Sequence, residues 1–528
     1  MLGSGETTSE MTDKELPSPD ISKKRVNADA PATTFVKGHD AVFGIPRIDG
    51  APNYVNVGWI RAAVFLMKSQ VGLGVLGGSH ATVHKCSDII GLVRQKSLII
   101  YQASAVGVPF VFSAIGLIPG ILGIIGLSMM STWSSYVIGT FKLRHPEVHS
   151  IADVGFILGG RFGKELLGTL YALCESCRYE SPLRNPALIR FLTTDTLCIC
   201  ASGLLSISIA LNALTNHGTC SVTFVAAGSI AVYFLSIIRT IDKISFLGWI
   251  GMVSILSAIF TLGVAVGVQD RPAAAPQTGP WDGHFQLVGH PKFYKALSAL
   301  GTIVVGFGGT PAFFNVVSEM RDPKDFPKTV LLCQGSITFV YLVVGIIVYA
   351  FCGDYVTSPA LGSAGPVLKK VCYGLALPAL IVGSVIYLHL SAKYIFVRLL
   401  RGGPHLVSNS AIHWITWLSL VLGCVTFAFF IAEAIPVFSG LIDLVGSLFG
   451  TMMTLSIMGV MWLYDHLEER HSNTTWRYRA LVAWNIWMIA GGAFLMVAGT
   501  YGSTVLIRAS YAGKALTAFS CAGNSESA

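Results

Sequence analysis

The chain has 528 residues, of which 53% are hydrophobic and only 12% are Asp, Glu, Lys or Arg. Its mean hydropathy is +0.64, whereas soluble domains carry about 25% charged residues, so the composition excludes an ordinary soluble protein. The formal net charge of +8 does not indicate nucleic-acid binding, because the basic residues are scattered between apolar runs and form no basic face interleaved with aromatic residues.

Three regions follow one another along the chain. Residues 1–57 are polar, contain several prolines and lack the apolar core of a signal peptide, so we expect a disordered cytoplasmic tail. From residue 58 to residue 508, apolar runs of about 20 residues recur, which is typical of helices that cross a bilayer. A short C-terminal tail, 509–528, ends the chain. The sequence therefore predicts an all-α polytopic membrane protein.

The apolar runs predict about eleven transmembrane helices, several of them tilted or interrupted. The clearer spans cover residues 117–140, 221–238, 245–268, 296–317, 330–351, 371–397, 412–432, 437–463 and 481–506. A further span lies near 166–214 in two pieces, and the first span contains a glycine-rich run.

The basic residues in short connections predict the orientation of the chain in the membrane. Lys and Arg concentrate in the N-terminal tail and in the connections 142–165, 239–243, 321–328, 398–401 and 470–479. Because these alternate with poorly basic connections, we expect a cytoplasmic N-terminus and an external C-terminus. The sequon at Asn473 then lies in the cytoplasm, and a glycan there would contradict this orientation.

The positions of the eleven cysteines do not indicate a fold held together by disulfides. Cys333, Cys352, Cys372 and Cys424 stand singly within or beside apolar runs, which favours buried free thiols. Two close pairs, Cys174 with Cys177 and Cys198 with Cys200, imitate the spacing of a metal site. They border a segment that fits the membrane span poorly, so we expect no metal.

The run Gly72-Leu73-Gly74-Val75-Leu76-Gly77 matches the G-x-G-x-x-G pattern of dinucleotide sites. A dinucleotide site needs a preceding strand and an acidic residue about 20 positions later, but a membrane-helix stretch precedes this run, and Arg94 and Lys96 stand where the acid is needed. Close helix packing through small residues and a helix broken inside the membrane remain as interpretations.

A second interrupted span favours the broken helix. In residues 304–320, Gly306, Gly308, Gly309 and Pro311 lie in the middle of an apolar run. Pro311 removes a backbone donor, and unpaired backbone groups in hydrocarbon survive only where they line a cavity. Two breaks that lie five spans apart are what a transporter with inverted repeats predicts.

Several longer runs resemble a known family. They are GLGVLG, VPFVFSAIGLIPG, IGTFKLRHPEVHSIADVG, SIALNAL, FFNVVSEMRDP and YLHLSAKYIFVRLL. In this order they resemble fungal members of the amino acid/auxin permease family, close to the fungal neutral amino acid permeases, from residue 58 to about 500. The resemblance implies a LeuT-type fold with a 5+5 inverted repeat and secondary active import of amino acids, generally driven by protons.

Two segments fit this pattern poorly. Residues 78–107 separate GLGVLG from VPFVFSAIGLIPG and place four charged residues inside a span, where each costs roughly 2.5–3.5 kcal/mol. Residues 175–198 interrupt the third span with six more charges. Both segments are short and aperiodic, so our hypothesis is that they are translated intervening sequence; the alternative is a pair of regulatory insertions. A transcript that contains both segments would rule out the first interpretation.

The two breaks predict a substrate site. Freed N–H groups of the first break suit a carboxylate, and freed carbonyls of the second suit an ammonium group. The expected substrate-binding residues are Gly72, Gly74, Val75, Gly77, Gly306, Phe307, Gly308, Gly309, Thr310 and Phe313. Neither break holds a fixed charge, which favours neutral aliphatic or aromatic substrates, with selectivity from Phe307 and Phe313.

Lys68 is the candidate for proton coupling, because an intramembrane amine one turn before Gly72 can gain and lose a proton. In proton-driven members of the fold such an amine stands where others bind sodium, so we expect the proton rather than sodium and no further cofactor. The alternative is that Lys68 reaches the cytoplasmic interface.

Other ionisable residues have structural interpretations. We expect Glu319 to pair with Arg321 or Lys324 at the cytoplasmic end of the sixth span. His389 and Lys393 share a helix face and form either an interfacial pair or a proton relay.

An enzyme is not expected, because His389 is the one histidine placed within a span and no acidic residue accompanies it. A non-transporting amino acid sensor of the same fold stays open. The expected partners are an amino acid and the lipid bilayer, in the plasma membrane rather than the vacuolar membrane. The preferred amino acid and the oligomeric state stay open.

Overall fold

The computed structural model describes residues 55–76, 108–148, 151, 153–160, 186–272, 274–308, 310–356, 360–400, 405–406, 408–434, 446–467, 475–513, 519 and 521. Within these residues the chain is helical, and the one β-bridge joins Val57 to Met320. Val57, just before the expected boundary at residue 58, is therefore already paired with a later part of the chain. The glycine Gly77 and the segment 78–107 lie outside the described residues.

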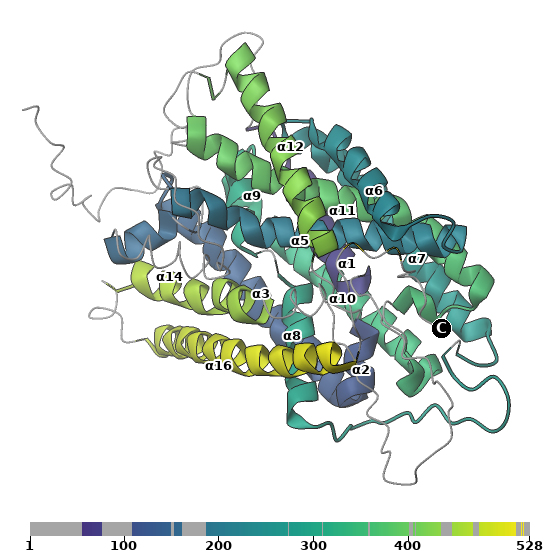
Figure 1. Ribbon diagram of the computed structural model, residues 1–528. Coiled ribbons are helices and arrows are strands. Elements are labelled where there is room, and N and C mark those ends of the chain that lie inside the picture. The colour runs from purple at the N-terminus through teal and green to yellow at the C-terminus, as the bar shows by residue number, and fades with distance from the viewer. Residues whose placement is uncertain are drawn as a thin grey trace, which may run out of the picture. The chain divides into compact units, whose positions relative to one another are not determined.

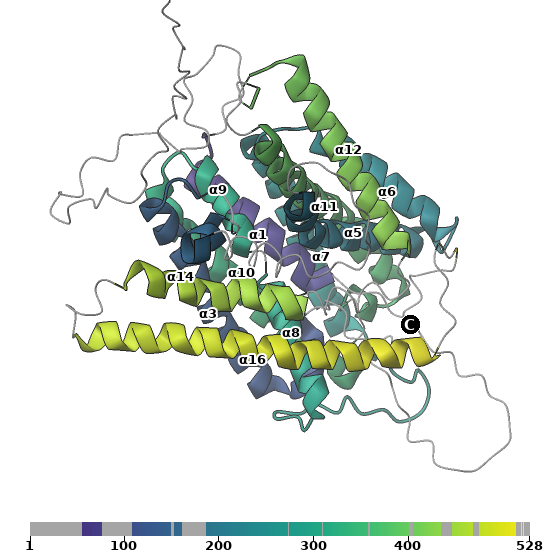
Figure 2. The same cartoon turned by 60° about the vertical axis from the view of Figure 1, so that its left-hand side comes forward.

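Two sets of helices follow each other in the chain (Figure 1). The first set is α1 (Trp59–Leu76), α2 (Val108–Ile115), α3 (Leu117–Arg144), α5 (Pro186–Thr215), α6 (Ser221–Ser236) and α7 (Ile241–Val268). The second set is α8 (Phe293–Gly306), α9 (Phe313–Glu319), α10 (Phe326–Cys352), α11 (Pro366–Leu400), α12 (Ala411–Ala434) and α14 (Ile457–Asp465), with π-helical turns at Gly446–Gly450 and Met452–Ser456 before α14. The helix α16 (Trp476–Gly513) follows both sets and lies beside α14 in both views (Figures 1 and 2).

The lengths and compositions of these helices confirm an all-α polytopic membrane protein. Six helices are long and apolar enough to cross a bilayer, and three shorter apolar helices cover Ile199–Thr215, Ser221–Ser236 and Phe293–Val304. Large apolar side chains such as Phe260 and Phe339 are 75% and 68% exposed. Such exposure is costly in water but favourable toward lipid.

Several contacts between the two sets come in reciprocal pairs, although within the described residues the extensive contact of α7 with α11 has no equivalent between α14 and α5. The first span (α1 with α2) packs against α10, and α3 packs against α8 and α9; likewise α5 packs against α12, and α6 against α11. The equivalent spans also meet, since α1 contacts α8, α3 contacts α10 and α5 contacts α11. A two-fold relation between two five-span repeats requires this reciprocity, as the expected 5+5 arrangement does.

The structure describes part of residues 175–198, the second segment that interrupts the pattern of membrane spans. Residues 175–185 lie outside the described residues, but residues 186–198 are helical and continue into the rest of α5 without a break. The hypothesis that the two segments are intervening sequence stays a prediction.

The cysteines divide into free and paired groups. Cys333, Cys352, Cys372 and Cys424 are buried free thiols, as expected. The sequence did not predict the disulfide between Cys220, just before α6, and Cys521 in the C-terminal tail. The backbone N–H of Phe519 donates to the carbonyl of Glu433 at 3.0 Å, so this part of the tail also contacts the end of α12.

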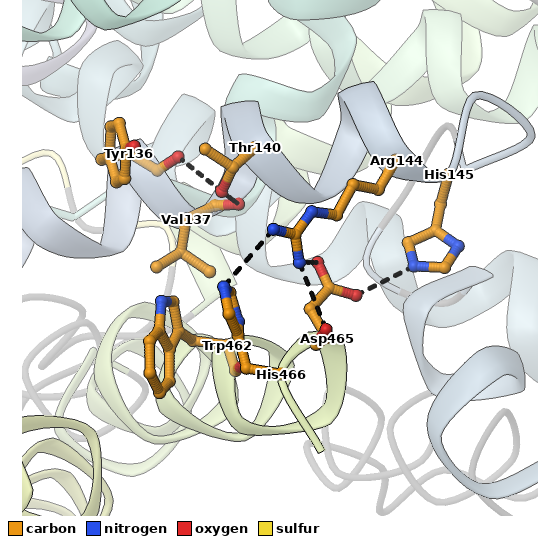
Figure 3. Close-up of polar contacts among 8 residues, drawn as sticks. All are labelled: Tyr136, Val137, Thr140, Arg144, His145, Trp462, Asp465 and His466. Carbon is orange, nitrogen blue, oxygen red and sulfur yellow. Dashed lines mark hydrogen bonds and ion pairs between the residues drawn. The ribbon is translucent and has the colours of Figure 1, made fainter. Parts of the chain in front are cut away.

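The ends of α3 and α14 are joined by a polar cluster (Figure 3). His145 Nε2 lies 2.9 Å from Asp465 Oδ1, and Arg144 donates to the Asp465 carbonyl oxygen at 3.2 Å. The ring of His466 stacks on Trp462 with 4.2 Å between centroids and lies within reach of Arg144. The hydrogen bond to Asp465, with the negative charges of Asp465 and Glu147, raises the pKa of His145 above 6.5 although burial opposes it.

This raised pKa predicts a pH dependence of stability. Protonated His145 stabilises the fold fully below its unfolded pKa of 6.5, and this contribution is lost as the pH rises through the higher folded pKa. We expect the melting temperature in detergent to fall between about pH 6 and about pH 8 by more in the wild type than in His145→Gln. Asp465→Asn should reduce the slope in the same way; slopes equal to that of the wild type in both variants would contradict the assignment.

Close helix contacts in the bundle depend on glycine, as at Gly345 of α10. A Cβ at this position would overlap the buried ring of Phe112 on α2. We expect Gly345→Ala to lower the free energy of unfolding by about 1–3 kcal/mol, measured as a lower melting temperature in detergent.

Gly335 is a matched control on the same helix, because no heavy atom lies within 4 Å of its built Cβ. Gly335→Ala should leave stability unchanged or raise it by about 1 kcal/mol. Equal effects of the two substitutions would show that the contact with Phe112 does not limit the approach of α2 to α10.

Candidate functional site

The sixth span is broken where the sequence predicts it. Helix α8 ends at Gly306, and a 3₁₀ turn over Thr310–Ala312 leads into α9. Phe307 and Gly308 lie between these helices outside regular helix, while Gly309 lies outside the described residues. The missing N–H of Pro311 and the flexibility of the glycines explain why the helix stops inside an apolar run.

The first span does not break where the sequence predicts it. Gly72, Gly74 and Val75 are helical, because α1 continues through Leu76. Their N–H groups therefore belong to a helix, and the groups left over at the end of α1 are carbonyls. This corrects the expectation that N–H groups of these residues are free to bind a carboxylate. The chain resumes at α2, whose N-terminal turn begins at Val108.

Tyr341 of α10 joins the two interrupted spans. Its hydroxyl lies 3.1 Å from the carbonyl oxygen of Gln70 on α1 and 3.0 Å from that of Gly306 at the end of α8, and it donates to both positions. Its ring meets Phe307 edge to face at 5.4 Å between centroids. Tyr341 is fully buried. Sequence reasoning missed it, although a tyrosine within an apolar span requires a partner for its hydroxyl.

Other carbonyls near the breaks are also paired by side chains. The Tyr387 hydroxyl on α11 donates to the carbonyl of Ser69 at 2.7 Å. Ser131 of α3 donates to the carbonyl of Phe307 at 3.4 Å, and Gln334 of α10 donates to the Ser131 hydroxyl at 3.3 Å. Side chains from three neighbouring helices thus contact carbonyls of α1 and of the break after α8.

Three polar side chains near the breaks are buried without a hydrogen-bond partner among the described residues. They are the Lys68 amine, the Gln70 amide and the Thr310 hydroxyl. Each residue is fully buried. Most buried polar groups in proteins are paired, so these three are candidates to contact a polar ligand. Thr310 was expected in the site, whereas Gln70 was missed.

Lys68 lies where α1 meets α7 and α11. A Cβ on Gly251 of α7 would come within 2.7 Å of Lys68 Cε, and a Cβ on Gly383 of α11 would come within 3.3 Å of Nζ. These glycines make the room that the side chain occupies. Lys68 is fully buried, so it does not extend to an exposed surface as the alternative interpretation required.

The two expected selectivity residues have different surroundings. Phe307 is 1% exposed and faces Tyr341 between the interrupted spans. Phe313 is equally buried but packs against Phe326 at the start of α10, with 6.5 Å between ring centroids. Phe307 rather than Phe313 therefore lies against Tyr341, whose hydroxyl contacts both α1 and the end of α8.

The expected partner of Glu319 is wrong. Glu319 forms a buried ion pair with Lys393 of α11 rather than with Arg321 or Lys324. Arg321 instead donates to Asn56 at 3.0 Å. His389, one turn from Lys393, is buried with its ring edge to face against Trp417 at 5.2 Å. Lys393 thus pairs across helices rather than with His389 along one face.

A separate cavity of about 390 Å³ lies between α7 and α10. Its wall is apolar and includes Phe260, Phe339 and Val344. An amino acid carries two charges, and burying them without partners is costly. This cavity therefore does not suit an amino acid, in contrast to the polar groups at the interrupted spans.

Two interrupted membrane spans that face each other around buried polar groups define a polytopic membrane transporter. The chain matches the family described as "Transmembrane amino acid transporter protein" over residues 101–505, and it belongs to this family. The family is one of transporters and not of enzymes. The match covers the second interrupted span in full, but it includes only α2 of the first, because α1 lies before residue 101.

Two relatives agree with this assignment, and one solved structure shows a weaker similarity. The chain is 32% identical over 500 residues to a "Transmembrane transporter" of Fusarium pseudograminearum, covering 94% of both proteins. It is 29% identical over 457 residues to the "N amino acid transport system protein" of Neurospora crassa, covering 84% of this chain and 90% of the relative. The solved structure of MhsT in complex with L-phenylalanine is similar with a TM-score of 0.47 and 12% identity, covering 88% of this chain and 100% of MhsT.

Removing the Tyr341 hydroxyl should weaken the connection between the two spans. We expect Tyr341→Phe to lower the free energy of unfolding by about 1–2 kcal/mol, because two carbonyls lose their side-chain partner. The melting temperature in detergent measures this loss, and the initial rate of amino acid uptake should fall with it.

Tyr349→Phe is the matched control on the same helix. Its hydroxyl pairs with Gln286 in the α7–α8 connection, at 3.3 Å, away from both breaks. We expect this variant to keep the wild-type uptake rate. If both variants change uptake equally, the hydroxyl of Tyr341 has no special role at the breaks.

Proposed function

We propose that the protein imports neutral L-amino acids by secondary active transport coupled to protons. The observation that carries the proposal is the fully buried Lys68 amine on the first interrupted span, which has no hydrogen-bond partner among the described residues and faces α7 and α11. Membership of the amino acid transporter family supports the substrate class. The name of the Neurospora crassa relative, an amino acid transport system protein, agrees with it.

In this proposal the amino acid binds by its backbone groups. Its ammonium group binds carbonyl oxygens released at the end of α8 near Gly306, with the Thr310 hydroxyl and the Gln70 amide as further partners. Its carboxylate binds at the N-terminal end of α2, which begins at Val108, because the first N–H groups of a helix point toward an anion at its N-terminus. The role expected for Gly72 and its neighbours is thereby assigned to α2.

The proposed selectivity for neutral side chains follows from the surroundings of the second break. Residues 306–313 contain no charged side chain, and Phe307 is an apolar surface beside the unpaired polar groups. A charged substrate side chain would be buried there without a partner, which costs several kcal/mol. Bulky aliphatic or aromatic side chains would instead gain apolar contacts.

Coupling to protons is assigned to Lys68. Its amine lies between the first span and the helices α7 and α11, where a positive charge affects how these helices approach each other. Gain of a proton from one side and loss to the other would link proton movement to the change of conformation. An amine occupies the position that a coordinated sodium ion would otherwise need.

The proposed orientation has a cytoplasmic N-terminus and a multi-pass arrangement in the plasma membrane. The disulfide between Cys220 and Cys521 supports it, because disulfides persist in oxidising surroundings. The basic connections independently assign both cysteines to the external side. Asn473, whose glycosylation would contradict this orientation, lies outside the described residues.

Uptake into proteoliposomes tests the proposal. Wild-type protein should accumulate labelled neutral amino acid faster under an imposed inward proton gradient, and unlabelled bulky neutral amino acids should compete while lysine and glutamate should not. We expect Lys68→Ala to lose at least about 90% of the gradient stimulation while keeping exchange of amino acids across the membrane, because binding does not require the amine.

Lys328→Met is the control, since Lys328 is an exposed lysine on α10. It should keep the full response to the gradient. A Lys68→Ala variant with an unchanged response, or stimulation by a sodium gradient alone, would refute proton coupling through Lys68. Absence of uptake by the folded wild type under all gradients would favour the amino acid sensor.

A further inference from the structure

A buried ion pair lies at the end of the bundle where the chain enters α1. Lys393 of α11 donates through Nζ to Glu319 Oε1, and the backbone N–H of Ile241, the first residue of α7, donates to Glu319 Oε2 at 3.3 Å. Glu319 is 0% exposed and Lys393 is 2% exposed. The carboxylate at the end of α9 is therefore bound by two helices of the surrounding bundle.

The backbone of the same residue holds the segment before α1. Val57 donates to the Glu319 carbonyl at 3.0 Å, and Arg321 donates to the Val57 carbonyl at 2.9 Å. Glu319 thus joins four parts of the molecule: the entry to α1, the end of α9, the start of α7 and the later part of α11. Two of these parts belong to the interrupted spans, and the other two do not.

Burial makes this pair respond sharply to the loss of one member. When one charge is removed, the other stays uncompensated in an apolar environment, which favours entry of water. When both are replaced by uncharged groups, the contact is often as stable as before. An exposed pair on the same side, Arg61 with Asp242, also links α1 to α7, but solvent screens it.

We propose that the Glu319–Lys393 pair is the clamp that closes the path from the substrate site to the side of the membrane on which α1 begins. The inference rests on the proposed transport function, in which that side is the cytoplasm. The interrupted spans hold the site, and their ends meet α7 and α11 at this pair, so an open path on this side requires the pair to separate. Glu319 and Lys393 act as positioning residues and do not touch the substrate.

Ser318 provides a reporter for this opening. It precedes Glu319 on α9, is 2% exposed, and its hydroxyl has no hydrogen-bond partner among the described residues. In full-length Ser318→Cys protein in detergent, the rate of modification by a hydrophilic maleimide measures how often this side opens. Peptide mass spectrometry separates the introduced cysteine from the native cysteines.

Breaking the pair should open the clamp. We expect Glu319→Gln in the reporter protein to raise the modification rate at least about tenfold, because Lys393 loses its compensating charge. The double variant Glu319→Gln with Lys393→Met should return to within about threefold of the reporter alone, since no uncompensated charge remains and the amide still accepts from Ile241. Lys393→Gln breaks the same pair from the other side and replaces Glu319→Gln if that variant does not fold.

Asp242→Asn is the matched control, because it breaks the exposed pair between α1 and α7 one residue from Ile241. It should change the modification rate less than about twofold. Melting temperatures of all variants separate the clamp from a purely structural role. An unchanged modification rate in folded Glu319→Gln, or a double variant as reactive as the single one, overturns the proposal.

The modification assay needs no substrate, so it is independent of the transport assay. If the variants behave as expected but the wild type transports no amino acid, the proposed function fails and the clamp remains a property of the fold. If uptake is normal and the modification rates do not differ, the clamp fails and the proposed function stands.

Discussion

The pairing of backbone groups inside the membrane is the constraint on which this structure depends. A helix that stops within hydrocarbon leaves polar groups whose burial costs several kcal/mol each, so it survives only beside suitable partners. The hydroxyls of Tyr341 on α10 and Ser131 on α3 provide such partners for the carbonyls of Gly306 and Phe307 at the break after α8. Because these side chains belong to other helices, the neighbours of the interrupted span influence where its interruption is possible.

Helix association follows from the same environment. Lipid is as apolar as the helix surfaces, so helices associate through close packing at small residues and through polar contacts. Gly139 admits the ring of Phe326, Gly203 admits Ser384, and Gly251 admits the stem of Lys68. At these points the side chain of one helix occupies the space that the missing Cβ leaves on the next. The glycines therefore serve the site indirectly, by allowing the surrounding helices to reach it.

The sequence correctly predicted those features of the fold that depend on residues close together in the chain. Apolar length predicted the spans, and Pro311 with its neighbouring glycines predicted the break between α8 and α9. The sequence did not predict two contacts between distant residues: Glu319 pairs with Lys393, and Cys220 pairs with Cys521. The partners in these pairs are separated by 74 and 301 residues. Periodicity and spacing carry no information about contacts at such separations, which depend on how the two repeats pack.

Lys68 and Lys393 are both buried, but in different surroundings. The charge of Lys393 is compensated by Glu319, so removing it would leave a carboxylate buried without a partner. Such a pair is either formed or fully separated. Lys68 has no such partner among the described residues, so a change in its charge leaves no other buried charge uncompensated. Lys68 on α1 lies against α11, and Lys393 on α11 pairs with Glu319 on α9. In the proposed mechanism both lysines therefore act on the same movement, that of the interrupted spans against α11. Protonation of Lys68 would promote this movement, and the intact Glu319–Lys393 pair would prevent it.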